Sequence, residues 1–290
     1  GWCILLLVIT LSGTALPLAF GVEIASAIGI VSFLVSVALW ATIRPRVQWR
    51  RLPWYALAYV AWAVVSLLWT HWLDATVPTV ALLVVTTTAA VFVGAVLTWR
   101  ELVRALASAL KWMLGLSLVF EVWVSVVWGG PILPHFVRPD GPVDDPIVLW
   151  SRDNLIDGGR IQGIFGNSNA LAYVALLAVV VFVIRIASRA PRRPVLALWV
   201  LLALYLFVRA GSATATVSAV AVVVVLITVL VMRTTTRAGE RTRYYLVYGV
   251  VAIGGLLAAW LLRDRVFTAL GRSTDLTGRE SIWEKVLERA

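Results

Sequence analysis

The stretch "RIQGIFGNSNALAYVALLAVVVFVIR", residues 160–185, carries charge only at the arginines at its two ends. We place a transmembrane helix over about 164–187, because roughly 20 mostly apolar residues are enough to cross the hydrocarbon core of a bilayer. Asn167, Ser168 and Asn169 lie at the start of this helix, and residues of these types commonly cap helices. The sequence therefore predicts a membrane helix that is preceded by a cation and a group of small polar residues.

Eight further apolar stretches predict helices of the same kind. The chain is 61% hydrophobic and 14% charged, with a mean hydropathy of +0.93, whereas soluble domains are about 45–50% apolar and about 25% charged. We therefore expect an all-α polytopic membrane protein with about nine transmembrane helices in a single domain, residues 1–290. The other expected spans are 2–20, 22–43, 52–69, 77–98, 106–128, 195–209, 212–232 and 244–262.

The basic residues predict the orientation in the membrane. The net charge is +10, and 15 of the 25 lysines and arginines fall in four segments on one face, 44–51, 100–111, 185–193 and 233–243. Because basic loops are typical of the cytoplasmic side, we assign this face to the cytoplasm. This assignment explains the positive charge without a nucleic-acid partner. The connection 129–163 and the C-terminal segment are then extracytoplasmic.

The long extracytoplasmic loop, residues 129–163, contains five of the 11 prolines. Proline interrupts regular helix, so we expect irregular backbone that is docked on the helices. A loop of this length in a compact chain is usually functional.

Arg160 is the first candidate site residue, because it precedes the polar start of a helix by a few residues. Unpaired N–H groups and the helix dipole favour an anion at such a terminus, and a guanidinium adds a full positive charge. One interpretation is a phosphate site at the outer membrane surface. The alternative is an ordinary helix cap beside an interfacial arginine.

A second cation occurs in "TGRESIWEKV", residues 277–286. Thr277 and Glu280 match a capping box, which predicts a helix that begins near Gly278. Arg279 would then lie in the first turn, where a cation is unfavourable unless an anion compensates it. A salt bridge with a nearby acid is the alternative interpretation.

Two more charged residues lie within or beside the expected spans. Glu121 is inside the span 106–128, and an intramembrane carboxylate is either functional or a paired structural group. Arg209 precedes the small-residue stretch "GSATATVS", which suits close helix packing, and its charge can extend to the membrane surface. His71, His135 and Cys3 form no cluster with ligand spacing, so we predict no metal and no cofactor.

Three segments in order resemble the O-antigen ligase and polymerase family of bacterial polysaccharide assembly. They are "RIQGIFGNSNALAYVALL", "GSATATVSAVAVVVVL" and "TGRESIWEKVL", and the resemblance covers about residues 155–290. It implies a GT-C-like helical bundle in the bacterial cytoplasmic (inner) membrane. The implied activity is metal-independent transfer of a glycan from an undecaprenyl-diphosphate-linked donor to an acceptor sugar or lipid on the extracytoplasmic side, without a distinction between ligase and polymerase.

The resemblance also implies roles for individual residues. Arg160 and Arg279 match the family's arginines and would bind the donor diphosphate in bidentate fashion. Asn167, Asn169, Arg209 and Glu121 would support that site.

The sequence departs from the family pattern at two places. Family ligases carry a catalytic histidine beyond the "TGR" motif, and the sequence stops before that point, so no catalytic residue is assigned and we expect a chain that ends at Ala290 to be an incomplete, inactive enzyme. The family's "S-R-G" is replaced by residues 210–213. Two alternatives remain: a transporter or flippase of lipid-linked sugars, which only Glu121 favours, and a non-catalytic structural membrane protein.

Overall fold

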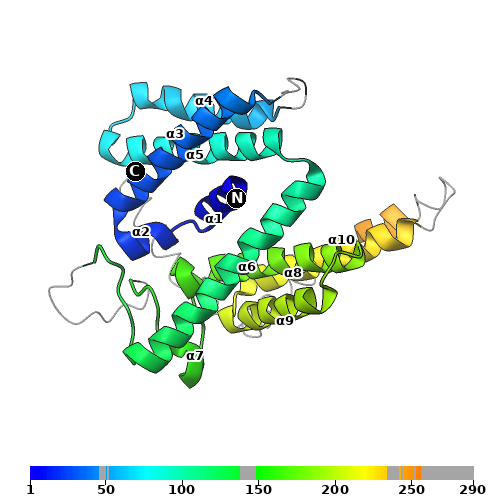
Figure 1. The fold of residues 1–290 in the computed structure, drawn as a ribbon. Coiled ribbons are helices and arrows are strands. Elements are labelled where there is room, and N and C mark those ends of the chain that lie inside the picture. Colours follow the sequence, from blue (N-terminus) through cyan, green and yellow to red (C-terminus); the bar gives the residue numbers. More distant parts are fainter. Residues whose placement is uncertain are drawn as a thin grey trace. The chain divides into compact units, whose positions relative to one another are not determined.

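The computed structural model describes residues 1–45, 50, 52–137, 148–233, 242, 244–250 and 253–255. In this part of the chain the regular elements are helices, accompanied by one isolated antiparallel bridge between Ile132 and Ser151 (Figure 1). The α-helices are α1 (Trp2–Leu11), α2 (Ala15–Phe20), α3 (Val22–Ile43), α4 (Trp54–Val65), α5 (Leu73–Val96), α6 (Trp99–Trp123), α7 (Asn154–Asp157), α8 (Ser168–Ala187), α9 (Arg193–Ala210) and α10 (Ala213–Arg233). The shorter elements are η2 (Ser66–Leu68), η3 (Val124–Trp128) and η4 (Gly163–Phe165).

The chain divides into two compact units, Gly1–Ala215 and Thr216–Ala290. The first unit includes the first residues of α10, Ala213–Ala215.

Six helices of the described chain are long and apolar enough to cross a membrane. They are α3, α5, α6 together with η3, α8, α9 and residues 213–230 of α10. This finding confirms the predicted class, an all-α, multi-pass membrane protein. The three other expected spans, 2–20, 52–69 and 244–262, coincide with shorter apolar helices, Trp2–Leu11, Trp54–Leu68 and Tyr244–Gly255, the last of which includes residues outside the described ranges. A total of nine transmembrane helices stays a prediction.

The expectation of one continuous span over 2–20 is wrong. Helix α1 ends at Leu11 and α2 begins at Ala15, and Gly13 between them has a φ of +56°, which glycine adopts without steric penalty. The Thr14 hydroxyl donates to the carbonyl of Phe165 at 2.8 Å. Thr14, between α1 and α2, therefore connects the N-terminal helices to the loop that precedes α8.

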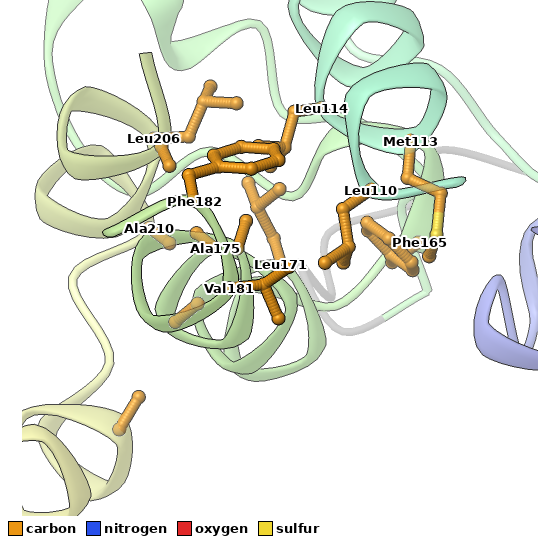
Figure 2. Packing of buried hydrophobic residues seen from close by; sticks show 14 of the residues in the cluster. Leu110, Met113, Leu114, Phe165, Leu171, Ala175, Val181, Phe182, Leu206 and Ala210 are labelled. Atoms are coloured by element: carbon orange, nitrogen blue, oxygen red, sulfur yellow. The ribbon is translucent and has the colours of Figure 1, made fainter. Parts of the chain in front are cut away.

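The main core lies among α6, α8, α9 and the loop before α8. Ala172, Ala175 and Ala178 are fully buried along one face of α8, while larger residues of the same helix, such as Ile184, are exposed. Figure 2 shows Phe182 of α8 beside Leu114 of α6 and Leu206 of α9. Small residues let membrane helices approach closely, and large apolar residues on the outer surfaces suit contact with lipid.

A smaller cluster holds α1 against α3 and α5. Leu6 of α1 is buried with Phe92 of α5, and the ring of Phe92 lies 6.2 Å from that of Trp40 in α3. The Trp2 indole donates to the hydroxyl of Ser36 at 3.2 Å. The Ser36 hydroxyl also donates to the carbonyl of Ser32 at 2.7 Å, so this contact gives the Trp2 indole an acceptor between the helices.

Candidate functional site

Glu121, near the end of α6, holds the loop that leads into α8. The side chain is 0% exposed, and one of its carboxyl oxygens accepts from the N–H groups of Gln162 at 2.9 Å and Gly163 at 2.6 Å. The other oxygen accepts from the hydroxyl of Ser151 at 3.0 Å. One turn earlier on α6, the Ser117 hydroxyl accepts from the N–H of Ile164 at 3.4 Å. Of the two interpretations of Glu121, this geometry favours the paired structural group.

The long loop has the irregular, docked backbone that its prolines predict, in its described parts 129–137 and 148–163. Ile132 and Ser151 exchange backbone hydrogen bonds across the loop. The Trp150 ring stacks on Phe120 of α6 at a centroid distance of 4.6 Å, and its indole N–H donates to the carbonyl of Ile164 at 3.0 Å. Helix α6 therefore positions the segment that carries Arg160.

Gly163 is required at the point where the loop meets α6. Its φ is +57°, and a Cβ atom built there would lie 2.8 Å from both Cβ and Oγ of Ser117. We expect Gly163→Ala to lower the melting temperature in detergent, because a left-handed backbone costs a non-glycine residue about 1–2 kcal/mol and Ser117 must also move. Gly129→Ala is the matched control, since Gly129 has a φ of +70° but no atom within 4 Å of the added Cβ. Equal melting temperatures for the two variants would contradict the close contact.

Arg160 lies where three helix ends meet. Its Nε donates to the carbonyl of Ala210, the last residue of α9, at 3.1 Å, and one terminal nitrogen donates to Oδ1 of Asn169 in the first turn of α8 at 3.3 Å. The same Asn169 oxygen accepts from the hydroxyl of Ser212 at 2.7 Å. Ser212 in turn accepts from the N–H of Ala215 at 3.2 Å, as an N-cap of α10 does.

Asn167 caps α8, as its position in the sequence predicts. Its side-chain oxygen accepts from the N–H groups of Asn169 at 2.8 Å and Ala170 at 3.4 Å. The N-termini of α8 and α10 are therefore one hydrogen bond apart, with a guanidinium beside them. The C-terminal carbonyl of α9 favours this cation, whereas the two N-termini favour an anion.

Arg209 binds the loop, so its charge does not simply extend to the membrane surface. One terminal nitrogen donates to the carbonyls of Asn154 at 2.6 Å and Leu155 at 2.8 Å. The Arg209 carbonyl accepts from the N–H of Ile161 at 3.1 Å, and the Asn154 amide donates to the carbonyl of Arg160 at 3.0 Å. These contacts fix the backbone of Arg160 against the end of α9.

The structure thus brings together part of the predicted site. Arg160 and Asn169 are in contact and Asn167 caps the same helix, while Glu121 and Arg209 hold the supporting loop. Arg279 and the whole "TGRESIW" motif lie outside the described residues. Sequence reasoning missed the hydrogen bonds of Ser212, although a serine that follows Gly211 and precedes an apolar run matches a helix start.

Among the described residues, no group of three or more His, Cys, Asp and Glu side chains could hold a metal ion. Comparisons with protein-family models, with characterised proteins and with solved structures find no match to the chain. The fold therefore defines the class of the protein, a multi-pass helical membrane protein, and any closer assignment depends on the chemistry of the Arg160 cluster.

Proposed function

We propose that this protein binds the diphosphate of an undecaprenyl-diphosphate-linked glycan at Arg160 and takes part in transfer of the glycan to an acceptor sugar or lipid. The observation that carries the proposal is the contact of the Arg160 guanidinium with Asn169, between the N-termini of α8 and α10. Guanidinium groups bind phosphate oxygens through two parallel N–H donors, and helix N-termini add partial positive charge. A diphosphate suits this combination better than a single small anion, because its two negative phosphates can face both the guanidinium and the positive ends of the two helix dipoles.

The same arrangement suits the proposed reaction. An acceptor hydroxyl oxygen attacks the anomeric carbon of the glycan, the bond from that carbon to the diphosphate breaks, and the lipid diphosphate leaves with the bonding electrons. Donors held at the leaving group stabilise the charge that develops on it and so lower the barrier. The proton of the acceptor must pass to a base, and none of the described residues is assigned this role. We propose in addition that the mechanism is metal-independent and that the helices form a GT-C-like bundle.

The length of α8 supports a substrate that is carried by the membrane. The helix has 20 residues and is therefore about 30 Å long, close to the hydrocarbon thickness of a bilayer. Arg160 precedes one end of α8, and the arginine-rich segment 185–193 is at the other end. If the arginine-rich end is cytoplasmic, Arg160 lies at the extracytoplasmic surface, where the diphosphate of a lipid-linked donor would be.

A binding experiment tests the diphosphate site without requiring turnover. The purified chain in detergent is mixed with undecaprenyl diphosphate, undecaprenyl phosphate or undecaprenol, and native mass spectrometry measures how much of each lipid it retains. We expect preferential retention of the diphosphate, and loss of this preference in Arg160→Gln. Equal retention of the three lipids by the unmodified chain would contradict the proposal, because it would show that only the isoprenoid is bound.

A further inference from the structure

A groove between α6 and α9 takes no part in the Arg160 cluster. Its volume is about 480 Å³, and residues that line it are Lys111, Trp112, Gly115, Leu116, Val119 and Trp199. Gly115 lies against the indole of Trp199, since a Cβ built there would be in van der Waals contact with the ring at 3.5 Å. Trp112 is 62% exposed and Val119 is 66% exposed, so the groove opens on the outer surface of the helices.

One end of the groove is positively charged. The Nζ of Lys111 lies 5.8 Å from the centre of the Trp199 ring, and the charges of Arg185 and Arg192 act on Lys111. Within the described part of the chain, no acidic side chain forms an ion pair with Lys111. Three like charges, with no acidic partner of Lys111 among the described residues, favour an external anion.

The basic end of the groove is remote from Glu121. Lys111 precedes Glu121 by ten residues, which is about 15 Å along a helix. Arg185 is in the last turn of α8 and Arg192 directly precedes α9, so the cations are at the arginine-rich ends of these helices. Leu116 and Val119 continue along α6 toward Glu121, away from the cations. The groove therefore combines a basic end with an apolar surface that runs along a membrane helix.

We propose that this groove binds one anionic phospholipid, with its phosphate beside Lys111 and Arg185 and an acyl chain along Gly115, Leu116 and Val119. The charge selects an anionic headgroup, and basic pockets between membrane helices bind such lipids on the cytoplasmic side. The aromatic and aliphatic walls select an acyl chain over a soluble anion. This site is independent of the proposed glycan transfer, because it uses none of the Arg160 contacts.

Lipid retention by the full chain tests the proposal. The protein is purified in detergent and mixed with phosphatidylglycerol or phosphatidylcholine that carry the same acyl chains, and retained lipid and melting temperature are measured. We expect the unmodified chain to retain phosphatidylglycerol preferentially and to melt at a higher temperature with it, because a ligand of the folded state stabilises that state. Lys111→Gln should lose this preference, and Lys111→Arg should keep it.

Arg104→Gln is the charge-matched control, because Arg104 is exposed on the same helix and does not line this groove. It should retain phosphatidylglycerol as the unmodified chain does. An equal loss in Arg104→Gln and Lys111→Gln would overturn the proposal, since it would show attraction to the net charge alone. Equal retention of phosphatidylcholine, or the same rise in melting temperature with inorganic phosphate alone, would also overturn it.

Gly115→Leu tests where the acyl chain lies. This change keeps every charge but places a branched side chain in the groove, so we expect the retention of phosphatidylglycerol to fall by at least half. Helical content by circular dichroism and a monodisperse gel-filtration profile show whether each variant is folded. Retention at the unmodified level by a folded Gly115→Leu would overturn the acyl-chain placement.

Discussion

Replacing Arg160 with alanine is expected to lower the proposed glycan transfer by about 100-fold or more. Removal of one well-placed donor to a developing anion typically costs about 10²–10³ in rate. In this protein the guanidinium also places a full positive charge at the junction of α8, α9 and α10. Transfer is measured as the amount of glycan that moves from the lipid donor to the acceptor in membranes that contain equal amounts of the protein.

The controls must separate binding of the donor from support of the fold, because Arg160 also binds the carbonyl of Ala210. Arg160→Lys keeps the charge but loses the paired donors, so its activity should fall between those of the unmodified protein and Arg160→Ala. Arg189→Ala removes an exposed guanidinium beyond the other end of α8 and should leave transfer unchanged. Near-normal transfer by a folded Arg160→Ala would exclude the diphosphate role.

The membrane helices could largely be predicted from the sequence, because hydrocarbon leaves the backbone few ways to satisfy its hydrogen bonds. The expected span 22–43 has the same bounds as α3, and the expected span 164–187 contains the whole of α8. The span 2–20 was wrong because its hydropathy does not reveal the turn at Gly13. That turn is accompanied by a hydrogen bond from Thr14 to Phe165, far along the chain, and such a contact leaves no periodic pattern.

The candidate site could be predicted only in part, for a related reason. Arg160 and the Asn167 cap follow from local rules, since a cation and a cap are visible beside an apolar run. The contact of Asn169 with Ser212 depends on how α8, α9 and α10 turn back on one another, and no spacing in the sequence specifies it. The partners of Glu121 are two backbone N–H groups and one hydroxyl, which charge patterns cannot reveal.

Replacing Glu121 with alanine is expected to destabilise the protein severely. The change leaves the N–H groups of Gln162 and Gly163 and the hydroxyl of Ser151 without their acceptor in a fully buried position. Each buried donor that loses its acceptor costs about 1–3 kcal/mol, and total stabilities are only about 5–15 kcal/mol. We expect a strongly lowered melting temperature in detergent and a low yield of monodisperse protein. Ser151→Ala, which removes one of the three contacts, should cause a much smaller decrease.

Glu121→Gln separates the structural role of this residue from a role in transport. The glutamine carbonyl can accept from Gln162 and Gly163 as the carboxyl oxygen does, and its amide can donate to the Ser151 hydroxyl, which is able to accept. We therefore expect Glu121→Gln to melt near the unmodified protein and far above Glu121→Ala. A transporter that relied on titration of this side chain would instead lose lipid translocation in proteoliposomes on the same change. A folded Glu121→Gln variant that abolishes such flux would favour the transporter. A Glu121→Gln variant with a melting temperature as low as that of Glu121→Ala would show that the hydrogen bonds of the loop require a carboxylate.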